Sequence, residues 1–285
     1  TAVKRAFQAD KAGHTGTLDP MATGLLPICL GEATKYSQDL LEANKTYVAR
    51  VKFGSRTDTG DAHGLTIEEF PLPVFTSQAE LKKALDALLP KFTGLISQVP
   101  PMYSALKRDG RPLYEYARAG VELERTARDI HIHHICWTDI QWPEATLEVS
   151  CSKGTYIRSL AQDIGEALTC GAYLAGLRRT AVAGFREEQM LSLEKLEPLD
   201  FFERKAQLLP TDSLLLHLDR IDLDLNAAQR LIQGQRLPAA AHGARANTGL
   251  VRLYRPDGQL LGTGSIDERG VLAAQRLIAQ SSFSL

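Results

Sequence analysis

The chain has 285 residues, 44% of them hydrophobic and 24% charged, values that predict a folded protein with one large domain or a large and a small one. Its 33 basic and 34 acidic side chains nearly cancel, so any RNA-binding surface is expected to be local rather than global. The four cysteines are widely spaced and no apolar run approaches about eighteen residues, which argues against a disulfide scaffold, zinc knuckles and a membrane span. We therefore expect a cytoplasmic protein.

The sequence starts at Thr1, within a stretch whose apolar spacing predicts an amphipathic helix over residues 2–9, so a preceding segment is expected to be missing. A polar loop then runs from Gly13 to Gly24 and reads Gly-His-Thr-Gly-Thr-Leu-Asp-Pro-Met-Ala-Thr-Gly. Its one carboxylate belongs to Asp19, and Pro20 biases the backbone of that residue towards an extended conformation at a corner. The loop is expected to present Asp19, with an ordinary Asp-Pro turn as the alternative interpretation.

Hydrophobic periodicity predicts both helices and strands beyond this loop. The expected strands are 25–30, 46–53 and 65–70, and the expected helices are 32–41 and 77–89, the latter with Ser77 as N-cap. A second polar loop, residues 54–64, contains Asp58 and Asp61. Because the ligand spacing of an EF-hand is absent there, no calcium site is expected.

Residues 98–120 interleave aromatic and basic side chains. Among them are Tyr103, Lys107, Arg108, Arg111, Tyr114, Tyr116 and Arg118. Cations neutralise phosphates while aromatic rings and guanidinium planes stack on unpaired bases, which is the combination that looped or single-stranded RNA requires. A solvated hairpin with a few packed tyrosines fits the composition equally well.

Residues 128–140 contain side chains of the types that ligate metals. They are His131, His133, His134 and Cys136. The isoleucines between them predict a β-strand, and no paired ligand spacing such as His-x-x-x-His on a helix is present. We interpret them as structural or surface side chains and expect no metal site.

A strand at 147–151 leads through a Gly-containing bend into a predicted helix at 159–168, which places Arg158 in the first helical turn. An arginine there is poorly placed for the helix dipole, so an anionic partner elsewhere is expected. The remaining predictions are a strand at 172–183, a helical region at 192–208 broken at Pro198, a helix at 225–233 and strands at 249–254, 259–266 and 271–278. From residue 210 these elements predict a small β-rich domain.

Six sequence blocks agree in order and spacing with a known family. They are Gly13–Pro20 with its continuation to Lys35, Lys45–Tyr47, Arg56–Asp61, Pro101–Lys107, Cys151–Arg158 and Leu177–Arg179. In them the chain resembles the bacterial tRNA pseudouridine-55 synthases of the TruB family, and the resemblance covers nearly the whole chain. It implies an α+β pseudouridine-synthase fold over residues 1–209, with a mixed, mainly antiparallel sheet, flanking helices and an RNA-gripping insertion at about 98–128. Residues 210–285 resemble the PUA module, a small RNA-binding β-barrel.

The resemblance implies an isomerase that breaks the N1–C1′ bond of uridine 55 in the TΨC loop of tRNA, turns the base and rejoins it through C5. Asp19 would be the essential carboxylate, either as a nucleophile on C1′ or C6 or as a base that takes the ribose 2′-proton. Tyr47 would stack on the flipped uracil, and Arg158 would hold Asp19 ionised. Leu177 would keep water out of the pocket.

The family likeness also implies which residues hold the RNA. His14 would fill the space vacated by the extruded base, and Asp61 would support the network of Arg158 and Asp19. Further RNA-binding positions would be Tyr103, Lys107, Arg108, Tyr156 and Arg179. The TΨC stem-loop of tRNA is then the partner of a monomer that needs no cofactor, no metal, no membrane and no obligate protein partner. The family's first strand and Lys-Pro dipeptide would precede Thr1.

Three other function classes stay open. A non-catalytic tRNA-binding or tRNA-folding protein would keep every function after loss of Asp19. A guide-dependent pseudouridine synthase subunit would share the aspartate motif but require partner proteins and guide RNA, although the insertion and the length favour the stand-alone type. A metal-dependent hydrolase built on His131, His133 and aspartates would lose its activity in EDTA.

Overall fold

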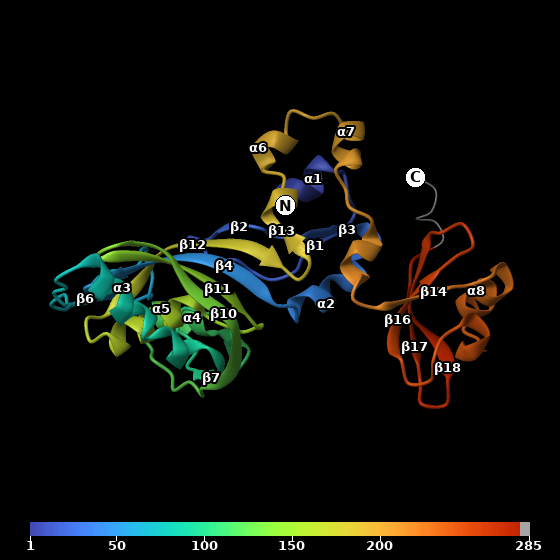
Figure 1. Cartoon of the computed structure of the whole chain (residues 1–285). Helices are drawn as coiled ribbons and strands as arrows, with labels where there is room; N and C mark the ends of the chain where they lie inside the picture. Colours follow the sequence, from blue (N-terminus) through green and yellow to red (C-terminus); the bar gives the residue numbers. More distant parts are fainter. Residues whose placement is uncertain (280–285) are drawn as a thin grey trace. The chain divides into compact units, whose positions relative to one another are not determined.

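The computed structural model of the chain describes residues 1–279 (Figure 1). Its backbone divides into two units. The central unit comprises Gly16–Leu26 and Glu42–Met190, and the terminal unit comprises Thr1–Thr15, Pro27–Leu41 and the chain from Leu191 onward. Each unit is therefore assembled from segments that are not contiguous in the sequence, whereas the family likeness suggested a single boundary between residues 209 and 210.

The central unit is built on a sheet of seven strands. Six form an antiparallel path: β13 (Phe185–Arg186), β12 (Ala172–Val182), β4 (Lys45–Phe53), β11 (Glu144–Cys151), β10 (Arg128–Gln141) and β7 (Gly94–Gln98). The seventh, β2 (Thr23–Gly24), pairs parallel with β12. The expected α+β class with a mixed, mainly antiparallel sheet is confirmed.

Sequence periodicity decides which face of this sheet is buried. In β4 the side chains of Ala49, Val51 and Phe53 are buried while Arg50 is exposed, as the alternation predicts. The edge strand β7 was not predicted, because its Leu95 is exposed and Gly94 interrupts the apolar pattern.

Two helices pack on the buried face of the sheet, on the same side in Figure 1. The first, α3 (Gln78–Asp86), begins as predicted, since the Ser77 side chain accepts a hydrogen bond from the backbone N–H of Glu80. A short 3₁₀ helix, Leu89–Phe92, follows it. The second, α5 (Ile157–Ala167), carries Arg158 in its first turn, also as predicted.

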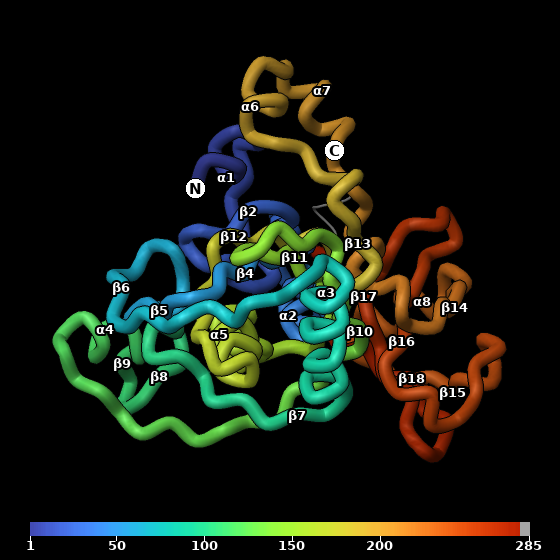
Figure 2. Tube along the Cα trace, turned by 60° about the vertical axis from the view of Figure 1, so that its left-hand side comes forward, coloured from blue at the N-terminus to red at the C-terminus, as the bar shows by residue number. Residues whose placement is uncertain are grey.

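Two smaller pieces extend from the sheet. A hairpin of β5 (Ser55–Thr57) and β6 (Thr66–Glu69) follows β4. Between β7 and β10 the expected insertion contains β8 (Lys107–Arg108), β9 (Arg111–Pro112) and α4 (Leu113–Arg118), which Figure 2 shows as one long excursion. Within α4 one residue, Leu113, is buried, so local packing does little to fix this segment.

The terminal unit combines short helices with two small sheets. Its first part contains α1 (Ala2–Ala6), a strand pair β1 (Ala12–His14) and β3 (Ile28–Leu30), and α2 (Ser37–Leu41) preceded by a 3₁₀ helix, Gly31–Tyr36. Its last part contains α6 (Leu193–Leu196), α7 (Phe201–Ala206), α8 (Leu225–Ile232) and the sheet β14 (Asp219–Asp222), β16 (Gly249–Tyr254), β17 (Leu260–Ile266), β18 (Val271–Leu277) and β15 (Leu237–Pro238). The small β-rich C-terminal part is confirmed. The strand expected at 25–30 is shorter than predicted, since β3 spans Ile28–Leu30 and pairs with β1.

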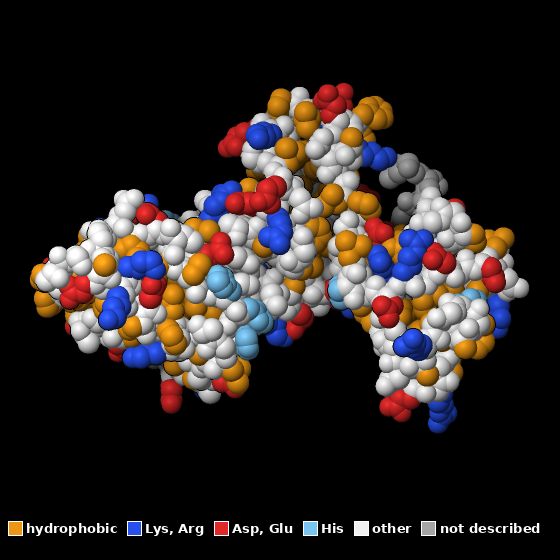
Figure 3. Space-filling model, in the orientation of Figure 1, with side chains coloured by type: hydrophobic (Ala, Val, Ile, Leu, Met, Phe, Trp, Pro, Cys, Tyr) orange, Lys and Arg blue, Asp and Glu red, His pale blue; other side chains and the backbone are white. Residues whose placement is uncertain are grey.

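The surface matches the balanced composition. On the face seen in Figure 3, acidic and basic side chains are interspersed over each unit. Within residues 1–279, every helix falls short of the length and apolarity that crossing a membrane requires.

Candidate active site around Asp19

The loop that presents Asp19 is closed by a tight turn. The backbone N–H of Ala22 donates to the carbonyl oxygen of Asp19 at 2.8 Å, with Pro20 in the second position of the turn, so Asp19 sits at the expected corner. The loop ends at Gly24, whose φ of +95° and close approach leave no room for a side chain: a Cβ would lie 2.3 Å from the carbonyl oxygen of Arg179. The sequence of the loop thus fixes where the carboxylate emerges.

Arg158 holds the Asp19 carboxylate with two hydrogen bonds. Its Nε donates to Oδ2 at 2.8 Å and its Nη2 donates to Oδ1 at 3.2 Å. The guanidinium is itself fixed, because Nη1 donates to the carbonyl oxygen of Thr59 at 3.0 Å and Nη2 to that of Tyr103 at 2.7 Å. Arg158 is 4% exposed, whereas the Asp19 side chain keeps 32% of its surface. A fork of this kind orients a carboxylate while leaving it reachable.

Asp61 is the second carboxylate of this network. It is buried, and its Oδ2 lies 3.7 Å from Nε of Arg158. Its Oδ1 accepts hydrogen bonds from the Thr59 hydroxyl at 2.8 Å and from the backbone N–H of His63 at 3.0 Å. One buried guanidinium therefore lies between two carboxylates, only one of which is open to solvent.

Two tyrosines lie beside Asp19. Burial raises the pKa of the Tyr47 hydroxyl; the neighbouring guanidinium of Arg179 opposes this rise, and the charge of Asp19 adds a small amount to it. The pKa of Tyr156 is also raised by burial, with a smaller contribution from Asp19. Both phenols are therefore neutral near pH 7 and present apolar ring surface next to the carboxylate.

Leu177 and Arg179 come from β12, next to β4 in the sheet. Leu177 pairs with Ala49 and is buried in the core of the central unit. Arg179, expected to bind RNA, is instead 1% exposed, and its guanidinium donates to the carbonyl oxygens of Leu25 and Gly16 at 2.8 and 3.3 Å. Its contacts hold the backbone on both sides of Asp19, which makes it a support for the loop.

The insertion residues are arranged differently. Lys107 and Arg108 are exposed in β8, while the half-buried Tyr103 is tied to Arg158 through its carbonyl. Two neighbouring arginines lie over tyrosine rings, Arg111 over Tyr116 at 4.8 Å and Arg118 over Tyr114 at 5.4 Å. A base that stacks on the covered face of either ring must displace an arginine.

His14 ends β1 in the terminal unit and is exposed, and its expected role in base extrusion stays a prediction. A pocket that the sequence did not reveal lies between the insertion and α5. Its volume is about 500 Å³, and Arg56, Tyr103, Arg125 and Asp163 are among its lining residues. Burial, with a smaller contribution from the charge of Glu166, raises the pKa of Asp163 to about 6.

Comparison with family models covers nearly the whole chain. Residues 4–157 match the TruB family pseudouridylate synthase N-terminal domain, residues 158–220 the tRNA pseudouridylate synthase B C-terminal domain, and residues 220–278 the C-terminal domain of pseudouridine synthase II TruB. The chain belongs to the TruB family of pseudouridylate synthases. It is accordingly a pseudouridine synthase, an isomerase.

Curated relatives that match nearly the whole chain are named tRNA pseudouridine synthase B. The chain is 51% identical over 282 residues to tRNA pseudouridine synthase B of Cupriavidus metallidurans, covering 96% of this chain and 87% of that protein. It is 51% identical over 278 residues to that of Burkholderia mallei, covering 96% and 90%. With the protein of Aromatoleum aromaticum it shares 50% over 276 residues, covering 97% and 86%.

Solved structures of more distant proteins share the fold. An H/ACA RNP bound to a substrate RNA containing 2′-deoxyuridine includes a chain with a TM-score of 0.67 and 24% identity, covering 97% of this chain and 79% of that one. A chain in a Cbf5–Nop10–Gar1 complex gives a TM-score of 0.65 at 24% identity, covering 96% and 78%. At this identity the likeness bears on the fold alone.

Proposed function

We propose that this chain converts uridine 55 in the TΨC loop of tRNA to pseudouridine after base extrusion, with Asp19 as the essential carboxylate. The observation that carries the proposal is the fork of Arg158 on Asp19, which fixes an accessible carboxylate at a loop corner. The names of the curated relatives support tRNA as the substrate. The TruB motif blocks from Gly13 to Arg179 support position 55.

The reaction conserves every atom of the uridine. The N1–C1′ bond breaks, the base turns, a C5–C1′ bond forms, and the proton lost from C5 is balanced by one gained at N1. No co-substrate is needed, so the enzyme has to position, stabilise and exclude water. Asp19, the accessible carboxylate of the network, would act as a nucleophile on the sugar or base, or as a base towards the ribose 2′-proton.

Arg158 acts on the substrate through Asp19. Its two hydrogen bonds hold both oxygens of the carboxylate, so Asp19 is oriented before the uridine arrives. Asp61, 3.7 Å from the same guanidinium, holds Arg158 from the buried side. We assign Arg158 and Asp61 as positioning residues and Asp19 as the catalytic group.

The aromatic and apolar neighbours handle the detached base. Tyr47 is neutral and half-buried beside Asp19, so its ring suits stacking on a flipped uracil. Leu177, in the core next to β4, closes the pocket towards water, which would otherwise hydrolyse a cationic sugar intermediate. The insertion contributes Lys107 and Arg108, whose charges are free to meet phosphates.

The test maps pseudouridine by mass spectrometry in unmodified tRNA incubated with purified protein and EDTA, without guide RNA or partner proteins. Wild type is expected to modify position 55 alone, and tRNA with cytidine at 55 is expected to yield none. Asp19→Asn is expected to yield none, while the matched control Asp86→Asn, an aspartate of α3 paired with Lys82, matches wild type. Modification at another position, or full turnover by Asp19→Asn, contradicts the proposal; a requirement for guide RNA supports the guided class instead.

A further inference from the structure

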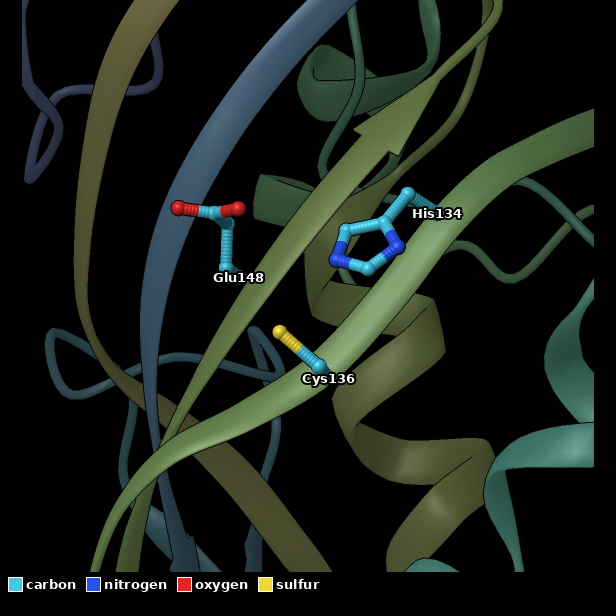
Figure 4. A group of neighbouring side chains, drawn as sticks. All are labelled: His134, Cys136 and Glu148. Atoms are coloured by element: carbon cyan, nitrogen blue, oxygen red, sulfur yellow. The ribbon is translucent and has the colours of Figure 1, made fainter.

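The outer surface of β10 and β11 carries three donor side chains of different chemistry. The ligand atoms of His134, Cys136 and Glu148 all lie within 4.8 Å of one another. Cys136 pairs directly with Glu148 across the two strands, and His134 precedes Cys136 by two residues, so the three share a face. Figure 4 shows the Cys136 sulfur directed towards the space between the imidazole and the carboxylate.

A β-bulge places His134 in this group. Ile132 pairs with Cys151 and His134 with the next residue back, Ser150, so β10 contains one extra residue between them. As a result Ile132 and Ile135 both face the core, and His134 turns outward with Cys136. The sequence spacing alone did not indicate a metal site, because the bulge and the ligand from a second strand are both invisible in it.

The three side chains have no competing partners. Among residues 1–279, none of them makes a side-chain hydrogen bond or an ion pair with another residue. Glu144, also on β11, lies 3.5 Å from Arg50 and 4.0 Å from Lys52, whereas Glu148 forms no ion pair with any of the described residues.

We propose that His134, Cys136 and Glu148 form a binding site for a divalent transition-metal ion of the zinc class. Imidazole nitrogen, thiolate sulfur and carboxylate oxygen are the ligands that Zn²⁺ takes in proteins, whereas Mg²⁺ and Ca²⁺ prefer oxygen throughout. On binding, the Cys136 thiol releases its proton to solvent and its sulfur bonds to the ion. Three protein ligands leave one position for water.

This site is separate from the one around Asp19. Glu148 pairs with Val48 on β4, and the side chain of Val48 points away from that of its neighbour Tyr47. The metal therefore binds on the sheet face opposite Tyr47, and Figure 3 shows histidine side chains exposed over β10 and β11. The isomerase reaction does not pass through it.

Alkylation of native protein tests the site directly, because Cys136 is the one cysteine of the four that is not buried. Metal-stripped protein is treated with iodoacetamide, with and without Zn²⁺, and modification of Cys136 is followed by peptide mass spectrometry. Saturating Zn²⁺ is expected to slow the modification by about tenfold or more, since a bound thiolate is a poor nucleophile, and EDTA is expected to restore it. With Co²⁺ in place of Zn²⁺, a thiolate-to-cobalt charge-transfer band is expected in wild type and absent in Cys136→Ser.

Matched variants locate the other two ligands. His134→Asn and Glu148→Gln are expected to weaken protection by about tenfold or more each. His131→Asn, a histidine of the same strand that stacks on His133, is expected to retain it. All three positions lie outside the core, so folding is preserved. Equal alkylation with and without Zn²⁺ overturns the proposal, as does protection that survives both His134→Asn and Glu148→Gln or is lost in His131→Asn.

Discussion

Two regions of the central unit hold their functional side chains in opposite ways. Around Asp19, Arg158 is buried and spends four hydrogen bonds on the Asp19 carboxylate and two backbone carbonyls. In the insertion, Lys107 and Arg108 are exposed, and Leu113 is the buried residue of α4. The side chains of the first region are held in place before substrate binds. The second region has few buried contacts, so its backbone is able to adjust to the surface of an RNA.

One hydrogen bond ties the insertion directly to Arg158. The carbonyl of Tyr103, near the start of the insertion, accepts a 2.7 Å hydrogen bond from the same guanidinium that holds Asp19. Any movement of this part of the insertion on RNA binding thus acts on Arg158. Substitutions around Asp19 are therefore expected to change the rate constant of the reaction, and substitutions in the insertion are expected to change tRNA binding.

The largest effect is expected at Arg158. Arg158→Lys keeps the charge but loses the fork, so the single-turnover rate constant is expected to fall by about a hundred- to a thousandfold. The tRNA dissociation constant, measured by filter binding, is expected to change little because Arg158 is buried. Arg178→Lys is the control, an exposed arginine on β12. An equal fall of the single-turnover rate constant in both variants would contradict the positioning role of Arg158.

The second prediction concerns the contribution of Leu177, beside the Asp19 site, to the free energy of unfolding. Leu177→Ala is expected to lower the free energy of unfolding by about 2 to 4 kcal/mol, since it leaves a cavity in the core of the central unit. Urea denaturation checks this value. Leu65→Ala, at a side chain that is 77% exposed, is expected to change stability by less than about 0.5 kcal/mol.

Asp163 lies in the pocket between the two regions, and its effect depends on pH. Because burial, together with the charge of Glu166, raises its pKa to about 6 from 3.8, the folded state binds this proton more tightly than the unfolded state does. Its contribution to stability is therefore largest at low pH and is lost as the pH rises from about 4 to about 6. Asp163→Asn is expected to be more stable than wild type by roughly 1 to 2 kcal/mol at pH 7, allowing for solvent screening, with the difference vanishing near pH 4.

Thermal or urea unfolding of both proteins between pH 4 and pH 7 checks this prediction. A constant difference across that range would assign the effect to packing rather than to ionisation. Glu166→Gln, which removes the charge that also raises the pKa of Asp163, is expected to shift the transition towards lower pH.

The smallest effect on chemistry is expected in the insertion. The double variant Lys107→Gln with Arg108→Gln is expected to raise KM by about tenfold and to reduce the salt dependence of tRNA binding by about two counterions, with kcat nearly unchanged. Lys82→Gln, on α3, is the matched control. A fall in kcat with KM unchanged would contradict the proposed division of labour.

Much of the fold follows from local sequence signals. The alternation in β4 and the capping residue Ser77 are local signals, and they predicted the observed strand and the start of α3. The strand β7 and the bulge after Ile132 were missed, since pairing with neighbouring strands decides them. The exchange of segments between units likewise depends on long-range packing, which no local pattern encodes.

Site residues divide in the same way. The anionic partner of Arg158 was predictable from the sequence, because a positive charge in the first turn of a helix interacts unfavourably with the helix dipole. The RNA-binding role predicted for Arg179 does not agree with its burial, because the sequence does not distinguish an arginine buried under a loop from one that contacts phosphate. The carbonyls of Thr59 and Tyr103 carry no signature at all, because every residue has a backbone acceptor.

The most direct measurement compares chemistry and binding in one sample of Asp19→Asn. Single-turnover pseudouridine formation and the tRNA dissociation constant are determined with the same protein and the same tRNA. The account predicts no detectable pseudouridine and a dissociation constant within about threefold of wild type, because the carboxylate serves the reaction rather than the grip. Pseudouridine formation at the wild-type rate would contradict it.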